Sequence, residues 1–248
     1  MIGIISAMPE EIKQLMELSE GTEVHETGKR KYYIGRLWGK KVVMAYSRIG
    51  KVAAATTAVT MILNHNVENI IFTGVAGSIS PDIEIGDIVI GKRLIQHDLD
   101  ASPIFPQFEV PLLDKKFFEA DKLLSNKLYH AAQRFTENID KYISREDLKK
   151  FRINHPQIFR GDIASGDQFI SDMAQQQRIK DILPSVLCVE MEGAAVAQVC
   201  YEYDIPFAVL RTISDNADHN ADIDFNQFLH NIAEKYSMGI LENFFANL

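Results

Sequence analysis

The chain alternates short apolar runs of strand length with longer segments whose apolar residues recur at helical spacing. The first run, 2–6, is followed by Pro9 and two acidic residues, a combination that marks the start of a helix. Apolar residues at helical spacing near the C-terminus predict a helix over 225–245. The other predicted strands are 32–38 and 41–47 as a hairpin, 69–73, 87–94, a strand at Ile163, 186–189 and 207–213, and the other predicted helices are 52–63, 171–182 and 192–203.

This alternation predicts an α/β protein that forms a single domain over residues 1–248. The expected architecture is a central mixed, largely parallel β-sheet flanked by helices, because the crossover helices of parallel strands cover both faces of the sheet. The segment 74–86 has three glycines and lies between two predicted strands, so it is expected to be a loop.

Two segments depart from the alternation. Residues 98–113 hold three prolines among Ile104, Phe105, Phe108 and Val110, which predicts an extended loop with exposed apolar surface. Such a surface usually marks an interface. Residues 136–157 are dense in charge and are expected to form a solvated surface excursion.

Composition excludes several classes of protein. At 248 residues and 46% hydrophobic, the chain is long enough to bury a full core. The formal charge of −8 is spread along the chain without a Lys/Arg cluster, so nucleic acid is not an expected partner. No stretch has the length of a membrane span, the first residues lack the basic start of an export signal, and two cysteines suggest neither a disulfide scaffold nor a metal site. We therefore expect a cytoplasmic protein with buried thiols and no membrane association.

The segment VEMEGAA, 189–195, is the first candidate for chemistry, because Glu190 and Glu192 flank Met191 ahead of a run of small residues. Acidic side chains are seldom buried unless they are paired or functional, although acids at a helix start often only complement the helix dipole. Four further segments place polar or glycine-rich residues at the ends of predicted strands, and they are MPEEI at 8–12, TGVAGS at 73–78, SGDQFI at 165–170 and RTISDNAD at 211–218.

Together these five segments resemble the 5′-methylthioadenosine/S-adenosylhomocysteine nucleosidases of the purine nucleoside phosphorylase superfamily, and the resemblance covers nearly the whole chain. It implies hydrolysis of the N-glycosidic bond of 5′-substituted adenosines with release of adenine. No metal and no organic cofactor are implied. A dinucleotide site is not expected, because TGVAGS leads to another predicted strand rather than to a helix.

The resemblance assigns the two catalytic roles to carboxyl groups. Breaking the bond leaves a cationic sugar and an anionic purine, so the reaction needs a proton donor at purine N7 and a positioned water at C1′. By resemblance, Asp215 is the acid, and burial or nearby negative charge would have to raise its pKa. Glu11 is the implied base that orients and deprotonates the water, with the adjacent Glu10 as its rival. From the residues alone, Asp215 could instead cap the segment that follows it.

The resemblance also implies how the nucleoside binds. Glu192 would accept the ribose 2′- and 3′-hydroxyls, Met191 would lie under the sugar, and Phe169 would stack on adenine. The backbone of Ile170 would read the edge of the base, and Glu190 is expected to be structural. The further implied contacts are the backbone of Val75, Ala76 and Gly77, the side chain of Arg211 near Glu192, and the apolar side chains of Met8, Ile49 and Phe225. A structural ion pair for Arg211, and simple core packing for the apolar side chains, remain open alternatives.

One comparison separates hydrolases from phosphorylases. Phosphorylases of the superfamily bind phosphate through an arginine and a serine at the positions that Phe72 and Val75 hold here. A phenylalanine cannot neutralise an anion, so water is the implied nucleophile. Arg48 could supply a positive charge for phosphate, so a phosphorylase remains an open alternative.

Three alternatives to the main reading remain. They are a 6-amino-6-deoxyfutalosine hydrolase, a purine nucleoside phosphorylase, and a nucleoside-binding module without turnover. Binding alone would not require both Glu11 and Asp215, which opposes the binding module. The resemblance further implies a homodimer in which the loop 98–113 of each chain completes the site of the other.

Overall fold

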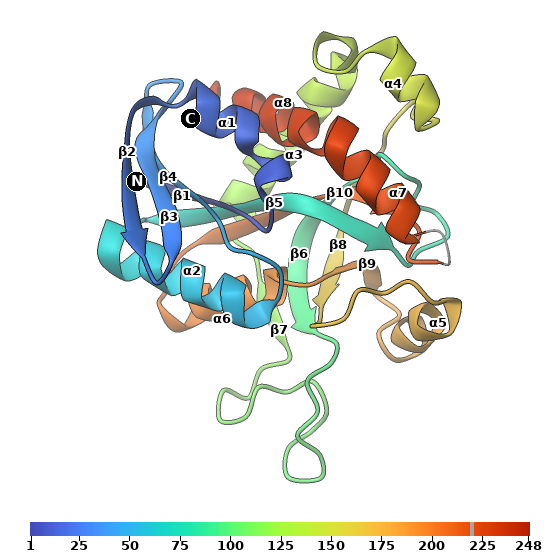
Figure 1. Cartoon of the computed structure of the whole chain (residues 1–248). Coiled ribbons are helices and arrows are strands. Elements are labelled where there is room, and N and C mark those ends of the chain that lie inside the picture. The colour runs from blue at the N-terminus through green and yellow to red at the C-terminus, as the bar shows by residue number, and fades with distance from the viewer. Residues whose placement is uncertain (219–220) are drawn as a thin grey trace.

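The computed structural model describes residues 1–218 and 221–248, in which one mixed β-sheet carries helices on both faces (Figure 1). The strands are β1 (Ile2–Ser6), β2 (Glu20–Thr27), β3 (Arg30–Leu37), β4 (Lys40–Tyr46), β5 (Asn69–Ser78), β6 (Ile88–Gln96), β7 (Phe117–Glu119), β8 (Ile158–Ser165), β9 (Val186–Glu190) and β10 (Phe207–Asp215). The expected α/β architecture is therefore confirmed.

The helices fill the connections between these strands. They are the 3-10 turn η1 (Pro9–Glu11), α1 (Lys13–Leu18), α2 (Lys51–His65), α3 (Lys122–Glu137), the 3-10 turn η2 (Ile139–Lys141), α4 (Arg145–Lys150), α5 (Met173–Ile182), α6 (Gly193–Glu202), α7 (Ala221–Phe228), the π turn η3 (Leu229–Ala233) and α8 (Glu234–Phe245). None of the helices in the described part of the chain is long and apolar enough to cross a membrane.

The sheet closes on itself through the strands whose ends carry the polar and glycine-rich segments. β1 pairs in parallel with β4 and β5, and β5 pairs in parallel with β10. β10 continues antiparallel to β6, which pairs in parallel with β8, and β8 pairs in parallel with β9. Because β9 returns to the end of β5, the strands β5, β10, β6, β8 and β9 form a closed ring.

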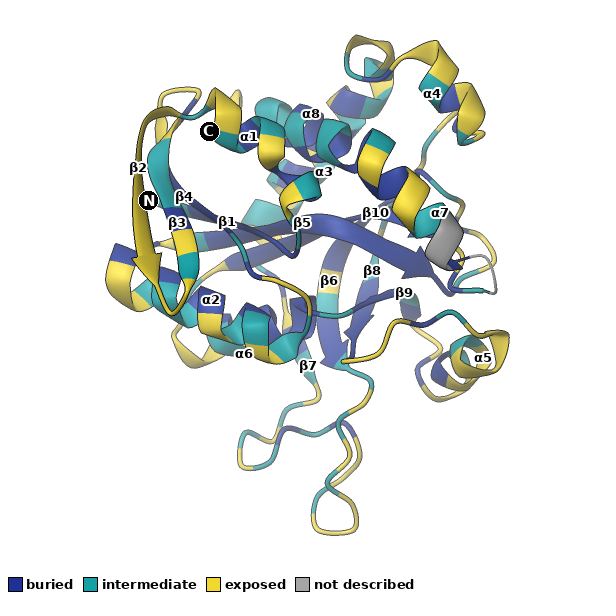
Figure 2. Ribbon diagram, in the orientation of Figure 1, coloured by how far each residue is buried: buried dark blue, intermediate teal, exposed yellow. Residues whose placement is uncertain are grey.

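Successive side chains of the central strands point to opposite faces of the sheet, so the core has two layers. Ile4 and Leu210 pack with α3 and α8 on one face of the sheet, whereas Ile5 and Val209 pack with α2 and α6 on the other. Neighbouring residues of a strand point to opposite faces, so an apolar strand can bury both faces only when helices cover both. The central strands are accordingly buried in Figure 2.

The sequence analysis missed one strand and assigned part of another to a loop. β2 was not expected, because all eight of its residues are exposed and it has no apolar alternation; it exists by pairing with β3. The segment 74–86 is not a loop throughout, because β5 continues to Ser78 and pairs there with β10 and β9. The connection to β6 therefore begins only after Ser78.

The charged segment 136–157 is less solvated than expected. Its Ser144 caps α4 as a helix start should, with Oγ accepting the Asp147 backbone N–H at 3.1 Å. However, Ile143, Leu148 and Ile153 are buried in the core layer that contains α3 and α8. The charged side chains form only the outer surface of this segment.

The C-terminal helical prediction is confirmed over 225–245, but the helix includes earlier residues and is not continuous in form. Helix begins at Ala221, before the expected start, and the π turn η3 interrupts it between α7 and α8. Phe228, Ile232 and Tyr236 are buried along it, which accounts for the apolar spacing in the sequence.

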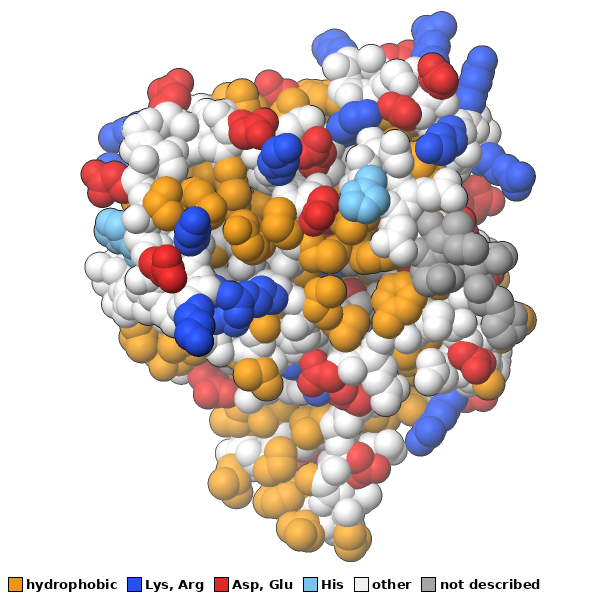
Figure 3. Space-filling model, viewed as in Figure 1, with side chains coloured by type: hydrophobic (Ala, Val, Ile, Leu, Met, Phe, Trp, Pro, Cys, Tyr) orange, Lys and Arg blue, Asp and Glu red, His pale blue; other side chains and the backbone are white. Residues whose placement is uncertain are grey.

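The loop 98–113 projects from the body of the molecule, with hydrophobic side chains at its tip (Figures 1 and 3). Ile104 is 82% exposed, and Leu112 nearby is 86% exposed. The expectation of exposed surface was wrong for Phe108 and Val110, because both are buried. Phe108 packs with apolar residues of β6 and β8, and Val110 makes a bridge to Lys115.

Candidate active site

A cavity of about 400 Å³ opens where several strands of the sheet reach their carboxyl ends. Ligands of α/β proteins bind at this edge, because the loops that follow the strands converge there. The cavity is lined by Ala7, Met8, Glu11, Ile49, Val75, Ala76, Gly77, Gln168, Phe169, Ile170, Val189, Glu190, Met191, Glu192, Ser214, Asp215 and Phe225. Every residue to which the resemblance gave a catalytic or binding role is among them except Arg211, whereas Glu10 and Arg48, the two alternatives, are not.

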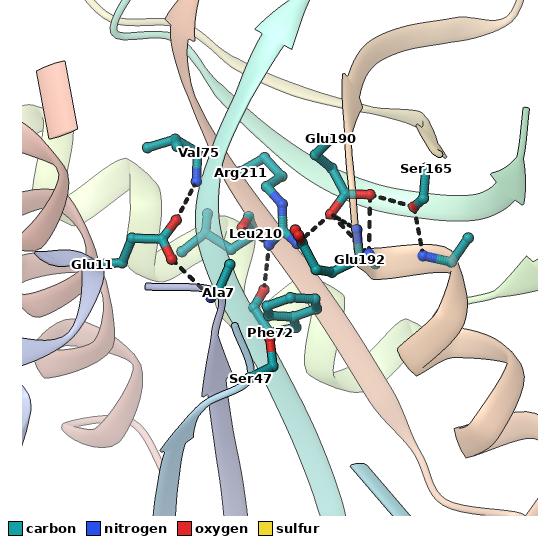
Figure 4. Close-up of polar contacts among 12 residues, drawn as sticks. Ala7, Glu11, Ser47, Phe72, Val75, Ser165, Glu190, Glu192, Leu210 and Arg211 are labelled. Carbon is teal, nitrogen blue, oxygen red and sulfur yellow. Dashed lines mark hydrogen bonds and ion pairs between the residues drawn. The ribbon is translucent and has the colours of Figure 1, made fainter. Parts of the chain in front are cut away.

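Glu11 is buried and is held by three backbone donors. Its Oε2 accepts the N–H groups of Ala7 and Met8, each at 2.8 Å, and its Oε1 accepts the N–H of Val75 at 3.1 Å (Figure 4). A Cβ on Gly74 would lie 2.6 Å from Oε1, so the strand needs a glycine there. Burial raises the pKa of Glu11 above its ordinary value and outweighs the three backbone donors and Arg211, which lower it. A carboxylate of raised pKa in a fixed orientation is suited to accept a proton.

Asp215 ends β10 and is only 2% exposed. Its Oδ2 accepts the Ser214 hydroxyl at 2.7 Å, and its Oδ1 accepts the Ala217 N–H at 2.8 Å. Burial raises the pKa of Asp215 to about 6, against the stabilising effect of these two donors. Asp215 therefore shapes the turn that follows it and also presents a carboxyl group that keeps a protonated fraction near neutral pH.

Glu192 lies at the N-cap of α6 and is also buried. Its Oε1 accepts the backbone N–H of Gly50 at 2.8 Å. No donor among the described residues is bonded to its Oε2. Burial, and next the negative charge of Glu190, raise the pKa of Glu192. The arrangement leaves one carboxylate oxygen available to hydroxyl groups of a ligand.

Glu190 and Arg211 form a buried ion pair beside the cavity (Figure 4). The Arg211 Nη2 lies 2.6 Å from Glu190 Oε2, and Glu190 also accepts the Ser165 hydroxyl and the Gly193 N–H. Arg211 Nη1 donates to the carbonyl oxygens of Phe72 and Leu210 at 3.2 and 3.0 Å. The structure thus brings Arg211 to an ion pair and not to the cavity lining, and it places Glu190 both in that pair and in the lining.

Aromatic and sulfur-containing side chains form the apolar part of the cavity. Phe169 is 42% exposed, and its ring meets that of Phe225 edge to face, with centroids 5.4 Å apart. Met8 and Met191 are half-buried beside them, and Ile49 is exposed at the rim. Such a slot suits a planar heteroaromatic ring together with an apolar substituent.

No lysine, arginine or histidine side chain lines the cavity in the described part of the chain. The Phe72 ring is buried against the Arg211 guanidinium, 4.1 Å from its centroid, and Val75 contributes only an apolar surface. Arg48 is exposed and donates to the carbonyl oxygen of Lys29 at 2.6 Å. The described residues also include no group of three or more His, Cys, Asp or Glu side chains that could hold a metal ion.

Sequence reasoning missed several lining residues, and two of them had a signal. Gln168 and Ser214 lie within SGDQFI and RTISDNAD, next to residues that were selected. Ala7 and Val189 carried no chemical signal of their own, because both are apolar; they reach the cavity from their positions after β1 and in β9.

Comparisons with known proteins agree with this geometry. The family profile described as "Phosphorylase superfamily" matches residues 1–246. A 5′-methylthioadenosine/S-adenosylhomocysteine nucleosidase of Staphylococcus epidermidis is 35% identical over 238 residues, which cover 94% of each chain. An aminodeoxyfutalosine nucleosidase of Campylobacter jejuni is 34% identical over 94% of this chain and 93% of its own. The crystal structure of the 5′-methylthioadenosine/S-adenosylhomocysteine nucleosidase of Neisseria meningitidis with methylthio-immucillin-A is similar with a TM-score of 0.87 and 31% identity, over 100% of this chain and 99% of that one.

Proposed function

Because the chain belongs to the phosphorylase superfamily, we propose that it hydrolyses the N-glycosidic bond of 5′-methylthioadenosine and S-adenosylhomocysteine and releases adenine. The relatives above share this class of enzyme, the nucleosidases, and the expected family is confirmed. One observation carries the assignment: a cavity that has no cationic side chain among its described lining residues joins the buried carboxyl groups of Glu11, Asp215 and Glu192 to an aromatic slot.

Asp215 is the proposed acid. As the bond between C1′ and N9 breaks, its electron pair goes to the purine, and the Asp215 proton goes to N7. The leaving adenine is then neutral, which lowers the barrier to its departure. The raised pKa of Asp215 supports this role, because an exposed aspartic acid would hold very little proton at neutral pH.

Glu11 is the proposed base. The sugar gains positive charge as adenine leaves, and water attacks C1′ while its proton passes to Glu11. The three backbone donors on Glu11 fix the direction of the carboxylate, so the water that it binds has a defined position. The negative charge of Glu11 also stabilises the cationic sugar.

Glu192 is the proposed ribose ligand, with its Oε2 accepting the 2′- and 3′-hydroxyls. Met191 would lie under the sugar, and adenine would occupy the aromatic slot with Phe169 against its face and the Ile170 backbone at its edge. The backbone of Val75, Ala76 and Gly77 lines the cavity, which supports close approach to the nucleoside. The apolar side chains of Met8, Ile49 and Phe225 would surround the ribose and its 5′-substituent.

Arg211 acts through Glu190 in this proposal. Its buried ion pair fixes the strand end that carries Glu190 and the following Glu192. Removing one member of a buried ion pair leaves the other charge without compensation and costs several kcal/mol, about 3 to 5. Substrate contact is not needed to account for an arginine at this position.

We further propose a homodimer in which the loop 98–113 covers the partner's cavity. Ile104 and Leu112 support it, because large apolar side chains that are more than four-fifths exposed favour burial against another surface. A two-fold arrangement lets each chain give and receive the same loop. The cytoplasmic location remains a prediction.

A second substrate is favoured by a specific observation, since the aminodeoxyfutalosine nucleosidase of Campylobacter jejuni is nearly as similar as the other relatives. The test is to incubate the purified protein with 5′-methylthioadenosine, S-adenosylhomocysteine and 6-amino-6-deoxyfutalosine and to measure adenine release. The proposal expects the first two to be hydrolysed with the higher kcat/KM. A clear preference for the third substrate would instead assign the chain to that activity, and adenine release from none of them would overturn the proposal.

A further inference from the structure

Three charged side chains from separate loops form a network at the edge of the cavity. Lys51 begins α2 after the loop that follows β4, Asp98 follows β6, and Asp167 follows β8. The Lys51 ammonium lies 2.5 Å from Asp98 Oδ1 and 3.9 Å from Asp167 Oδ2. The second Asp98 oxygen accepts the Asp167 backbone N–H at 2.8 Å. We call Lys51, Asp98 and Asp167 the clasp.

The clasp connects to Glu192 through the backbone of α2. The first N–H groups of a helix have no acceptor within the helix, and carboxylates are favoured there by the helix dipole. Two carboxylates meet this demand: the Gly50 N–H donates to Glu192 Oε1, and the Lys51 N–H donates to Asp167 Oδ1, each at 2.8 Å. Consecutive backbone groups therefore bind one carboxylate of the cavity and one of the clasp.

Gly50 links the clasp to Glu192. Its φ of 100° lies in the left-handed region, where a side chain is strained, and an added Cβ would lie 3.2 Å from Asp167 Oδ1. This conformation aims the Gly50 N–H at Glu192. The position of Gly50 depends in turn on Lys51, which follows it directly.

The ion pair of Lys51 and Asp98 can hold Lys51, and with it Gly50, in place. The side chains of Lys51 and Asp98 are 16% and 23% exposed, so solvent screens their attraction less than that of a surface pair. Burial acts against ionisation of Asp98, but the Lys51 ammonium and the Asp167 N–H outweigh it and lower the pKa of Asp98. Asp98 is therefore ionised at neutral pH.

We propose that the clasp positions the ribose-binding carboxylate: Lys51 fixes Gly50, whose N–H holds one oxygen of Glu192 so that the other receives the sugar hydroxyls. The inference rests on the proposed function, in which Glu192 binds those hydroxyls. None of the clasp residues lines the cavity, so Lys51 is a positioning residue and not a catalytic one.

The consequence is specific to the hydroxyls of the substrate. When the clasp is broken, Glu192 loses the Gly50 N–H that fixes its direction, and a misplaced contact contributes less to the transition state. The enzyme should then distinguish less well between a ribose and a sugar that lacks the hydroxyl. A loss of general stability would lower activity toward both substrates by the same factor.

The experiment compares kcat/KM for 5′-methylthioadenosine and for its 3′-deoxy analogue. It uses the wild-type chain, Lys51→Met, Asp98→Asn, Glu192→Gln, and Lys40→Met as a matched control at an exposed lysine. Lys51→Met is expected to lower kcat/KM for the full substrate about tenfold and for the analogue much less, which shrinks the ratio of the two. Asp98→Asn is expected to shrink the ratio in the same direction, and Lys40→Met to leave it unchanged.

The outcomes separate the clasp from the proposed function. A wild-type ratio in Lys51→Met and Asp98→Asn, together with a reduced ratio in Glu192→Gln, would overturn the clasp alone. A wild-type ratio in Glu192→Gln would overturn the ribose assignment and the clasp with it. If Lys51→Met does not fold, Asp98→Asn and Asp167→Asn decide the question, because each keeps the shape of the side chain that it replaces.

Discussion

Gly77 faces Asp215 across paired strands, and a Cβ on Gly77 would lie 2.7 Å from Asp215 Oδ1. A Cβ on Gly74 would likewise lie 2.6 Å from Oε1 of Glu11, which comes from the turn η1. The two glycines of β5 therefore leave the space that the two buried carboxyl groups occupy. Small residues in this segment are needed because the two carboxyl groups approach the strand.

The first prediction concerns Gly77→Ala. The added methyl group must displace the Asp215 carboxyl group, and a displacement of about 1 Å can lower kcat roughly 100-fold. Steady-state kinetics with 5′-methylthioadenosine measures the effect. Gly91→Ala is the matched control, since its Cβ would meet only atoms at 3.2 Å or more and these belong to Ile163 and Val209. Equal activity in the two variants would contradict the steric relationship.

The second prediction concerns the two catalytic assignments. Glu11→Gln and Asp215→Asn should each lower kcat at least about 100-fold, because each removes a proton transfer while it keeps the shape of the side chain. Glu10→Gln is the control, and it should retain activity. Circular dichroism should show intact folding in all three variants. Near-full turnover in either of the first two, with the chemical step rate-limiting, would remove that residue from its role.

The third prediction concerns the pH profile. Asp215 must be protonated to act as the acid, so kcat/KM should fall as the pH rises through its pKa of about 6. The Ser214 hydroxyl stabilises the ionised form of Asp215, and Ser214→Ala removes it. The pKa of Asp215 should therefore rise, and the alkaline limb of the profile should move to higher pH by about one unit. An unmoved limb, or one that moves to lower pH, would show that this limb reports another group.

The fourth prediction concerns the loop 98–113. Ile104→Glu and Leu112→Glu should weaken dimerisation, each by at least about tenfold, because a charge replaces an apolar side chain in the interface. The KM for 5′-methylthioadenosine should rise in the same variants. Phe108 is unsuitable for this test, since it is buried within its own chain. Analytical ultracentrifugation measures association, and a wild-type chain that is monomeric and fully active at assay concentration would contradict the proposed dimer.

Leu18→Glu serves as the control for those variants. Leu18 is an exposed leucine at the end of α1, remote in sequence from the loop, and its replacement adds the same charge. Neither association nor KM should change with it. A general effect of negative charge would appear in the control as well.

Apolar runs were sufficient to predict the central strands, because these strands are buried on both faces and read as continuous hydrophobic segments. The site could be predicted for a related reason. Residues directly after parallel strands converge at one edge of the sheet, so Glu11, Glu192 and Asp215 came together from distant parts of the sequence. Only the resemblance, however, distinguished their roles.

The misses have physical causes. β2 has no buried residue, so its only signal is the backbone pairing with β3, which leaves no mark on composition. TGVAGS suggested a loop because glycines usually interrupt strands, whereas here they make room for carboxyl groups inside one. α3 did have a signal that was overlooked, since Leu128, Ala131, Ala132 and Phe135 are buried at helical spacing.

Arg211 lies in a buried ion pair, which the sequence had left as an open alternative to a place at the nucleoside. The resemblance placed it near Glu192 and the water, and in the structure its Nη1 and Nη2 donate to Glu190 and to two carbonyl oxygens. Such pairing depends on tertiary contacts between β10, β9 and β5, which no local pattern in the sequence reveals.

The nature of the nucleophile tests the account most directly. 5′-Methylthioadenosine is incubated with the protein at high phosphate concentration, and the sugar product is identified by mass spectrometry. Because no cationic side chain among the described residues lines the cavity, phosphate should not compete with water. The account predicts adenine and free 5-methylthioribose, and formation of 5-methylthioribose 1-phosphate would contradict it.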